Sequence, residues 1–208
     1  MGKAVMYAVV SLDGFMADDN DGVGPLFDWY GNGDVSWSFP GGSDVSRTTQ
    51  ASADFMRSQY RDVGCVVMGR RLFDLTNGWD GVPAAGEHVF VVTHEPPKDW
   101  EHAGTAPFTF VDGVEAAIGA AQEFAGDRLV DVAGGQIGGQ ALRLGLLDQV
   151  VVNLVPVVFG SGRPFFATGA LDDPILFDNP SQIVRGDRVT HLVFDVAKKW
   201  VRADAGKT

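Results

Sequence analysis

The chain has 208 residues, of which 45% are hydrophobic and 21% charged, so general disorder is excluded and one globular domain over residues 1–208 is expected. The net charge of −11 argues against nucleic acid and anionic membranes as partners, because an acidic surface repels both. The single cysteine excludes a disulfide framework and any multi-cysteine metal site, and we expect no bound metal. Neither a secretion signal nor an apolar run of about 18 residues is visible, which favours a cytoplasmic protein.

Short apolar runs bounded by turn residues predict a series of strands alternating with helices. The first run, residues 3–10, is typical of a strand buried on both faces, as in a parallel sheet. Further strands are predicted at 65–68, 87–94, 107–111, 128–134 and 149–159. Helices are predicted at 48–60, with Thr48 or Thr49 as the cap, at 112–125 and at 135–144. This alternation predicts a mainly parallel α/β sheet.

Two stretches do not follow this alternation. Residues 11–46 are rich in glycine, aspartate and aromatic side chains, and a structureless loop of that length is either functional or wrongly assigned. We expect residues 18–46 to shape a substrate site. Near the other end, the segments 175–177 and 189–196 are strand-like with no helix between them, which predicts an antiparallel hairpin at the sheet edge.

The pattern strand–glycine–helix at 129–144 is the strongest chemical signal. Glycines at the end of a strand let the backbone approach a ligand, and the following helix directs its free N–H groups at an anion such as a diphosphate. The glycines fall at 134, 135, 138 and 139, which is not the GxGxxG spacing. Close packing of the helix on the strand explains them equally well.

Three other strand ends carry polar residues. Arg70 and Arg71 follow a buried strand, where paired guanidinium groups suit phosphate, although surface ion pairs are an equal alternative. Asp13 ends the first strand and could be a general acid, hold a water or bind a substrate hydroxyl, but an Asp-Gly turn is the favoured explanation. Thr93 and His94 end a third strand, and an ordinary strand stop before two prolines is favoured there.

Five segments, in this order, resemble the dihydrofolate reductase-like reductases. The chain is most similar to stand-alone relatives of the C-terminal reductase domain of the bifunctional riboflavin-biosynthesis deaminase/reductase. The matching segments are SLDGFMA (11–17), VVMGRRLFD (66–74), VFVVTH (89–94), VAGGQIGGQAL (132–142) and LLDQVVVNLVPVVFGSGRPFF (146–166). The resemblance implies a three-layer α/β/α domain with a mostly parallel sheet that binds NADPH.

The resemblance also assigns roles to individual residues. The segment that binds the adenosine 2′-phosphate corresponds to Gly69, Arg70 and Arg71, and the adenine side corresponds to Thr93 and His94. The segment that holds the diphosphate corresponds to Gly134, Gly135, Gln136, Ile137 and Gly138. The aspartate near nicotinamide and substrate corresponds to Asp13, which is the predicted catalytic residue.

The resulting hypothesis is an NADPH-dependent reductase that transfers a hydride to a small heterocycle, either like a ribosylaminopyrimidine of the riboflavin pathway or like a pterin. One alternative is an NADP(H)-binding module without turnover, suggested by Leu72, where the family often has threonine. Another is a true dihydrofolate reductase, which needs a carboxylate on the first helix. Asp54 falls near that place, but a solvated helical charge is the favoured interpretation. The apolar run 149–159 and the tail hairpin predict a homodimer.

Overall fold

The computed structural model describes residues 2–42, 45–169 and 173–196. Its main sheet is formed by β1 (Ala4–Ser11), β5 (Val63–Gly69), β6 (His88–Val92), β7 (Phe108–Val111), β8 (Leu129–Ala133), β9 (Gln149–Val155), β11 (Gln182–Arg185) and β12 (Thr190–Asp195). The α-helices are α1 (Gln50–Tyr60), α2 (Arg70–Asp80), α3 (Val114–Ala125) and α4 (Gln136–Arg143). Smaller elements are the 3₁₀ helix η1 (Gly24–Gly31) and the strands β2 (Phe15–Ala17), β3 (Val35–Trp37), β4 (Ser46–Thr48) and β10 (Arg163–Pro164).

The eight strands of the main sheet follow the order β11-β12-β9-β1-β8-β5-β6-β7. Neighbours from β9 to β7 run parallel, whereas β12 pairs antiparallel with β9 and β11 pairs antiparallel with β12. The predicted mostly parallel α/β sheet with an antiparallel hairpin at one edge is therefore confirmed. The parallel strands leave their carboxyl ends along one edge of the sheet.

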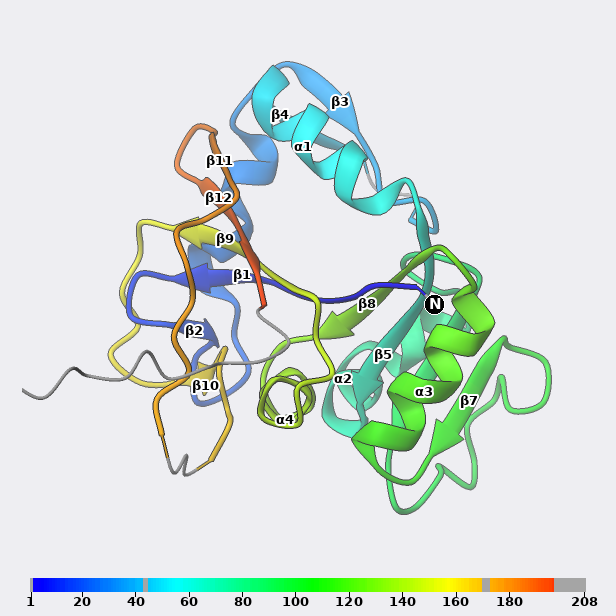
Figure 1. The fold of residues 1–208 in the computed structure, drawn as a ribbon. Coiled ribbons are helices and arrows are strands. Elements are labelled where there is room, and N and C mark those ends of the chain that lie inside the picture. Colours follow the sequence, from blue (N-terminus) through cyan, green and yellow to red (C-terminus); the bar gives the residue numbers. More distant parts are fainter. Residues whose placement is uncertain (1, 43–44, 170–172, 197–208) are drawn as a thin grey trace, which may run out of the picture.

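Helices cover both faces of the sheet and make three layers (Figure 1). Helices α3 and α4 contact each other and pack on β5 and β8, whereas α1 and α2 lie on the opposite face. Alternate residues of each strand serve the two layers: in β9, Val150 and Val152 face α3 and α4, and Val151 and Val155 face α1. This two-sided burial explains why the strand sequences are almost wholly apolar.

Helix α1 begins where its sequence predicts. The Thr49 side chain accepts a hydrogen bond of 3.3 Å from the backbone N–H of Ser52, which confirms the predicted cap. Helix α2 was not predicted from the sequence, and only Phe73 and Gly78 of its eleven residues are buried. Its last turn leaves the helical conformation at residues 77–79, where φ is positive.

Two boundaries in the second half of the chain differ from the predictions. Strand β9 ends at Val155 rather than at residue 159, because Pro156 has no N–H to donate to a ladder. The hairpin partner of β12 is β11 and not the segment 175–177, which forms no strand although it packs on the core through Ile175 and Phe177. The apolar residues of 175–177 therefore predicted contact with the core correctly, but they did not predict strand pairing.

The segment 11–46 contains short regular elements. Strand β2 pairs with β10, β3 pairs with β4, and η1 lies between β2 and β3, so the described part of that segment is not a structureless loop. Its two tryptophans pack on the body of the protein: Trp29 is 1% exposed and Trp37 is 5% exposed. They belong to the core beneath α1 together with Leu26 and Phe55.

The homodimer prediction assumed that the apolar run 149–159 lies at an exposed sheet edge, and this assumption was wrong. Strand β9 is an inner strand between β1 and β12, so its apolar character is explained within one chain. The homodimer itself stays a prediction.

None of the helices in the described ranges is long and apolar enough to cross a membrane.

Candidate functional site

Four adjacent strands end at the same edge of the sheet and bring most of the predicted site residues together. These strands are β1, β8, β5 and β6, which are neighbours in that order and run parallel. The carboxyl edge of an open parallel sheet is where ligands bind in α/β proteins. Segments separated by more than a hundred residues in the sequence therefore meet here.

The glycine pair after β8 lies against two other segments. The N–H of Gly135 donates to the Phe165 carbonyl at 2.8 Å, and the N–H of Phe165 donates to the Gly14 carbonyl at 2.8 Å. A Cβ on Gly134 would lie 2.6 Å from the Met16 sulfur, and Gly135 has a φ of +77°. Close backbone packing is therefore one reason for both glycines.

The start of α4 offers free backbone donors at this edge. Within the described ranges, the N–H groups of Gln136, Ile137 and Gly138 find no hydrogen-bond acceptor. The end of β5 is close by, since a Cβ on Gly69 would lie 3.0 Å from Ile137 Cγ1. A diphosphate near Gly69 would meet both these donors and the positive end of the α4 dipole.

Arg70 joins the ends of β5 and β6. Its Nε donates to Asp74 Oδ1 at 2.7 Å, and its Nη1 donates to the Glu95 carbonyl at 2.6 Å. The hydroxyl of Thr93 donates to the same carbonyl at 3.0 Å. The structure thus brings together Arg70 and Thr93, which the family resemblance assigns to the 2′-phosphate and to the adenine side of NADPH.

Arg71 is held by a residue of the 18–22 turn. Its Nε donates to Asp21 Oδ1 at 2.8 Å, and its Nη2 donates to Asp21 Oδ2. Arg163 Nε donates to Asp21 Oδ1 at 2.8 Å, and the two guanidinium groups lower the pKa of Asp21 to about 2. A shallow hollow is lined here by Asp21, Arg70, Arg71, Asp74 and Leu75. Sequence reasoning missed Asp21, because nothing in the DDNDG segment indicates its distant partners.

His94 stands apart from this group. Its side chain is 89% exposed, and its Nδ1 lies 2.6 Å from Asp112 Oδ1 beyond the end of β7. No hydrogen bond or ion pair joins it to Arg70, Arg71 or the start of α4 within the described residues. Its predicted place on the adenine side stays a prediction.

Asp13 is engaged by its own neighbourhood. It accepts hydrogen bonds from Ser11 Oγ at 2.6 Å, from the Gly160 N–H at 2.6 Å and from the Phe159 N–H at 3.1 Å. The Ser11 hydroxyl, followed by these backbone donors, lowers the pKa of the Asp13 carboxyl. An ionised carboxylate is no proton donor, so this geometry favours a role in holding a water or a substrate hydroxyl over a role as general acid.

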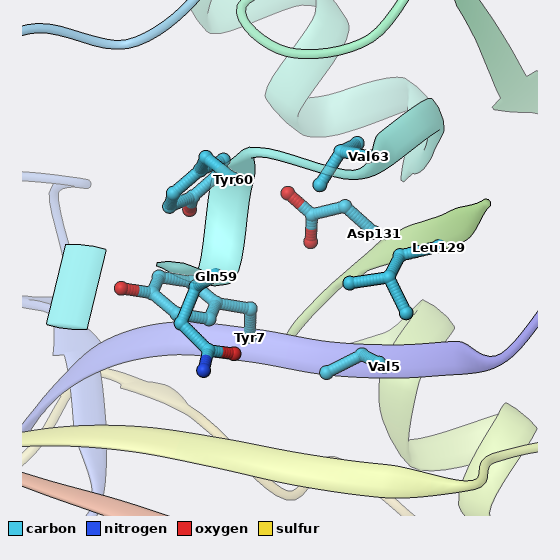
Figure 2. Close-up of a pocket in the computed structure, with 7 residues that line it drawn as sticks. All are labelled: Val5, Tyr7, Gln59, Tyr60, Val63, Leu129 and Asp131. Carbon is cyan, nitrogen blue, oxygen red and sulfur yellow. The ribbon is translucent and has the colours of Figure 1, made fainter. Parts of the chain in front are cut away.

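A small pocket opens on the α1–α2 face of the sheet, away from these strand ends. Its lining is formed by Val5, Tyr7, Gln59, Tyr60, Val63, Leu129 and Asp131 (Figure 2). The Asp131 carboxyl is directed into the space between Tyr60 and Val63, while the Tyr7 hydroxyl points away from it (Figure 2). Burial raises the pKa of Asp131 to about 7, and no hydrogen bond to this carboxyl is found among the described residues. The sequence indicated only a strand residue at this position.

Buried polar side chains continue across the same face beneath α1. His191 Nε2 lies 2.9 Å from Ser52 Oγ, His191 Nδ1 lies 2.6 Å from Asn153 Oδ1, and Asn153 Nδ2 donates to Tyr7 Oη at 2.5 Å. Burial lowers the pKa of His191 to about 4, so its ring is neutral at neutral pH. We call Ser52, His191, Asn153 and Tyr7 the polar row.

Comparison with known proteins adds three relatives, although no protein-family model matches the chain. The uncharacterized protein YwjB of Bacillus subtilis (strain 168) is 26% identical over 167 residues, which cover 79% of this chain and 82% of that protein. A Shewanella sp. PV-4 structure, provisionally named a riboflavin biosynthesis protein, matches with a TM-score of 0.62 and 23% identity over 94% of this chain and 98% of that one.

The third relative is a longer protein. It is the Thermotoga maritima diaminohydroxyphosphoribosylaminopyrimidine deaminase/5-amino-6-(5-phosphoribosylamino)uracil reductase, with a TM-score of 0.60 and 13% identity. The match covers 94% of this chain but 57% of that one. The fold is dihydrofolate reductase-like. The TM-scores establish a shared architecture, whereas sequence identities this low do not establish shared chemistry. The chemistry of this chain depends on its own residues.

Proposed function

We propose that this chain is an NADPH-dependent reductase that transfers a hydride to a small heterocyclic substrate, of the ribosylaminopyrimidine or pterin type. The supporting observation is the convergence at one sheet edge of the free N–H groups that begin α4 with the guanidinium groups of Arg70 and Arg71. A dinucleotide with an additional phosphate presents anions at two separated points, which these two groups of donors match.

The names of the structural relatives favour the ribosylaminopyrimidine type. One carries a provisional riboflavin biosynthesis name, and another is named as a reductase of 5-amino-6-(5-phosphoribosylamino)uracil. Both share the arrangement of strands that positions the donors in this chain. Transfer of that activity to this chain is part of the proposal.

The residues present fit NADPH in three respects. The N–H groups of Gln136, Ile137 and Gly138 would hold the diphosphate, and Gly69 packs closely against Ile137 beside them. Arg70 and Arg71 would hold the 2′-phosphate through charged hydrogen bonds. NADPH when bound supplies the hydride, and the protein would contribute orientation, placing donor and acceptor carbons roughly 3–3.5 Å apart.

Asp13 would serve this reaction as an ionised acceptor. Its carboxylate is fixed by Ser11 Oγ and by the backbone of residues 159 and 160, so it can orient a water or a substrate hydroxyl without moving. The proton that completes the reduction then has to come from such a water, since the contacts of Asp13 keep its own proton off at neutral pH.

Coenzyme titration tests the proposal. Wild-type protein should bind NADPH more tightly than NADH, and Arg70→Ala should weaken NADPH binding by about ten- to a hundredfold through the loss of charged hydrogen bonds, with a smaller effect on NADH. Asp54→Asn is a matched control, because Asp54 lies on the exposed side of α1. Negligible binding of both coenzymes by the wild type would refute the proposal.

A binding module without turnover is a second candidate, favoured by the state of Asp13. The acid that the sequence nominated for catalysis is ionised and already accepts hydrogen bonds from three donors. This candidate predicts NADPH binding with no coenzyme oxidation in the presence of pterins, pyrimidines or flavin precursors. Absorbance of NADPH followed across such a substrate panel separates the two candidates.

A further inference from the structure

Asp21 is a rigidly placed carboxylate in the hollow beside α2. The turn that carries it is closed by Asp18 Oδ1, which accepts from the N–H groups of Asn20 at 2.7 Å and Gly22 at 2.8 Å. Asp21 itself has a φ of +66°, and its side chain is 14% exposed, against 60% for Arg71. The carboxylate is therefore presented to the guanidinium by the backbone rather than by a freely mobile side chain.

The contact between Asp21 and Arg71 uses the edge of the guanidinium that binds phosphate well. Both carboxylate oxygens are engaged, one by Nε and the other by Nη2. A bidentate phosphate uses the same pair of parallel N–H groups. Carboxylate and phosphate cannot both take this edge of Arg71.

A second arginine keeps Asp21 in place independently of Arg71. Arg163 Nε donates to Asp21 Oδ1 at 2.8 Å, and Arg163 Nη2 donates to the Asp19 carbonyl at 2.8 Å. The turn is further joined to the 161–164 segment by Ser161 Oγ, which donates to Asp19 Oδ2 at 2.5 Å. Loss of the Arg71 contact would therefore leave Asp21 and its turn anchored.

Charge in the hollow is balanced in the same way. Arg70 is paired with Asp74, and Arg71 with Asp21, so each guanidinium that would attract a phosphate already faces a carboxylate. Asp21 is the more rigid of the two carboxylates, since the side chain of Asp74 is 52% exposed. A dianionic phosphate approaching Arg71 must displace or repel the Asp21 carboxylate.

We propose that Asp21 determines coenzyme specificity by competing with the 2′-phosphate of NADPH for Arg71. This inference rests on the proposed function and adds a residue to it. Binding of the 2′-phosphate transfers Arg71 from Asp21 to the phosphate, while Asp21 remains with Arg163. Asp21 thus lowers the preference for NADPH over NADH below what Arg70 and Arg71 alone would produce.

Removal of the Asp21 charge tests the competition. Asp21→Asn should tighten NADPH binding by about three- to tenfold, the effect expected when a partly exposed ion pair and its repulsion of phosphate are removed. Binding of NADH, which lacks the 2′-phosphate, should change by less than about twofold. Asparagine tolerates a positive φ and retains an oxygen for Arg163, so the turn should persist. Asp19→Asn is the matched control, since Asp19 contacts Ser161 and Arg163 but not Arg71.

A double-variant experiment checks that the effect passes through Arg71. In an Arg71→Ala background, the gain in NADPH affinity from Asp21→Asn should fall well below its value in the wild type, because the contested guanidinium is gone and only the repulsion between Asp21 and the phosphate remains. Unchanged or weaker NADPH binding by Asp21→Asn would overturn the competition, as would an equal gain for NADH. These results leave the proposed function intact when the wild type prefers NADPH. Failure of wild type and all variants to bind either coenzyme would remove both proposals together.

Discussion

The two faces of the sheet are stabilised differently. The face beneath α3 and α4 holds one continuous apolar cluster, from Ala4 on β1 to Phe165. The opposite face is divided into a cluster beneath α1 and another beneath α2, represented by Trp29 and Phe73. The polar row lies in the first of these clusters, and the Asp131 pocket lies between the two.

Comparison of the two faces shows what buried polar side chains contribute to a core that is otherwise apolar. Apolar contacts on the α3–α4 face are non-directional and tolerate exchange between side chains of similar volume. On the other face, His191 and Asn153 are fully buried, and each depends on specific partners on a different strand or helix. Hydrogen bonds of this kind specify which residues must meet, at the risk of a large loss when one partner is removed.

The largest effect is expected from breaking the polar row. Asn153→Leu should lower the free energy of unfolding by about 2–4 kcal/mol, because it leaves the His191 ring without its Nδ1 partner and Tyr7 without a donor in a buried site. Met6→Leu is the matched control on the apolar face, where Met6 is fully buried, and it should lower stability by less than about 1.5 kcal/mol. Urea denaturation at neutral pH measures both, and equal losses would show that the two faces do not differ.

An intermediate effect of opposite sign is expected at Asp131. Its pKa is raised to about 7 in the folded protein, compared with about 3.9 in an unfolded chain. The folded state therefore binds the extra proton, and the stabilising contribution of protonated Asp131 is lost as the pH rises from about 4 through 7. Asp131→Asn should raise stability by about 1–3 kcal/mol above pH 7 and by little near pH 4.

Urea denaturation across this pH range measures the difference between Asp131→Asn and the wild type. The other titrating groups, including His191, whose pKa of about 4 makes stability fall as the pH drops below about 6.5, are shared by both proteins and cancel. A difference that does not depend on pH, or a less stable variant at pH 8, would contradict the desolvation of this carboxyl.

The smallest effect is expected on the outer side of α1. Asp54 is 61% exposed, accepts from Gln50 Nε2 at 2.8 Å and pairs with Arg57 at 3.3 Å. Asp54→Asn should change stability by less than about 0.5 kcal/mol and leave folate turnover unchanged. Thermal denaturation and a dihydrofolate assay measure the two quantities. A tenfold loss of dihydrofolate turnover would instead support a true dihydrofolate reductase with its acid on this helix.

Prediction from the sequence succeeded where local signals and burial coincide. The strands that became β1 and β5 are apolar runs buried on both faces, and Thr49 caps α1 as its side chain allows. It failed where an element depends on distant contacts. Helix α2 buries only Phe73 and Gly78 against the rest of the protein, and β11 is recognisable only through its pairing with β12.

The candidate site divides in the same way. Gly134, Gly135 and Arg70 could be proposed as site residues because strand ends followed by glycine or arginine are visible in a short window of sequence. Asp21 and Asp131 were not found, because their importance comes from Arg71, Arg163 or Tyr60, residues 50 to 142 positions away. Pairing between residues far apart in the chain produces neither a periodic pattern nor a distinctive local composition in the sequence.

The amino-acid sequence alone determined the α/β class, the strand ends that carry polar groups and the glycine-led start of α4. Tertiary structure decided which polar side chains pair: Asp21 with Arg71, and His191 with Asn153. The physical reason is that backbone conformation and burial follow from side chains a few residues apart, whereas charge pairing and desolvation depend on packing between segments that only the folded sheet brings together.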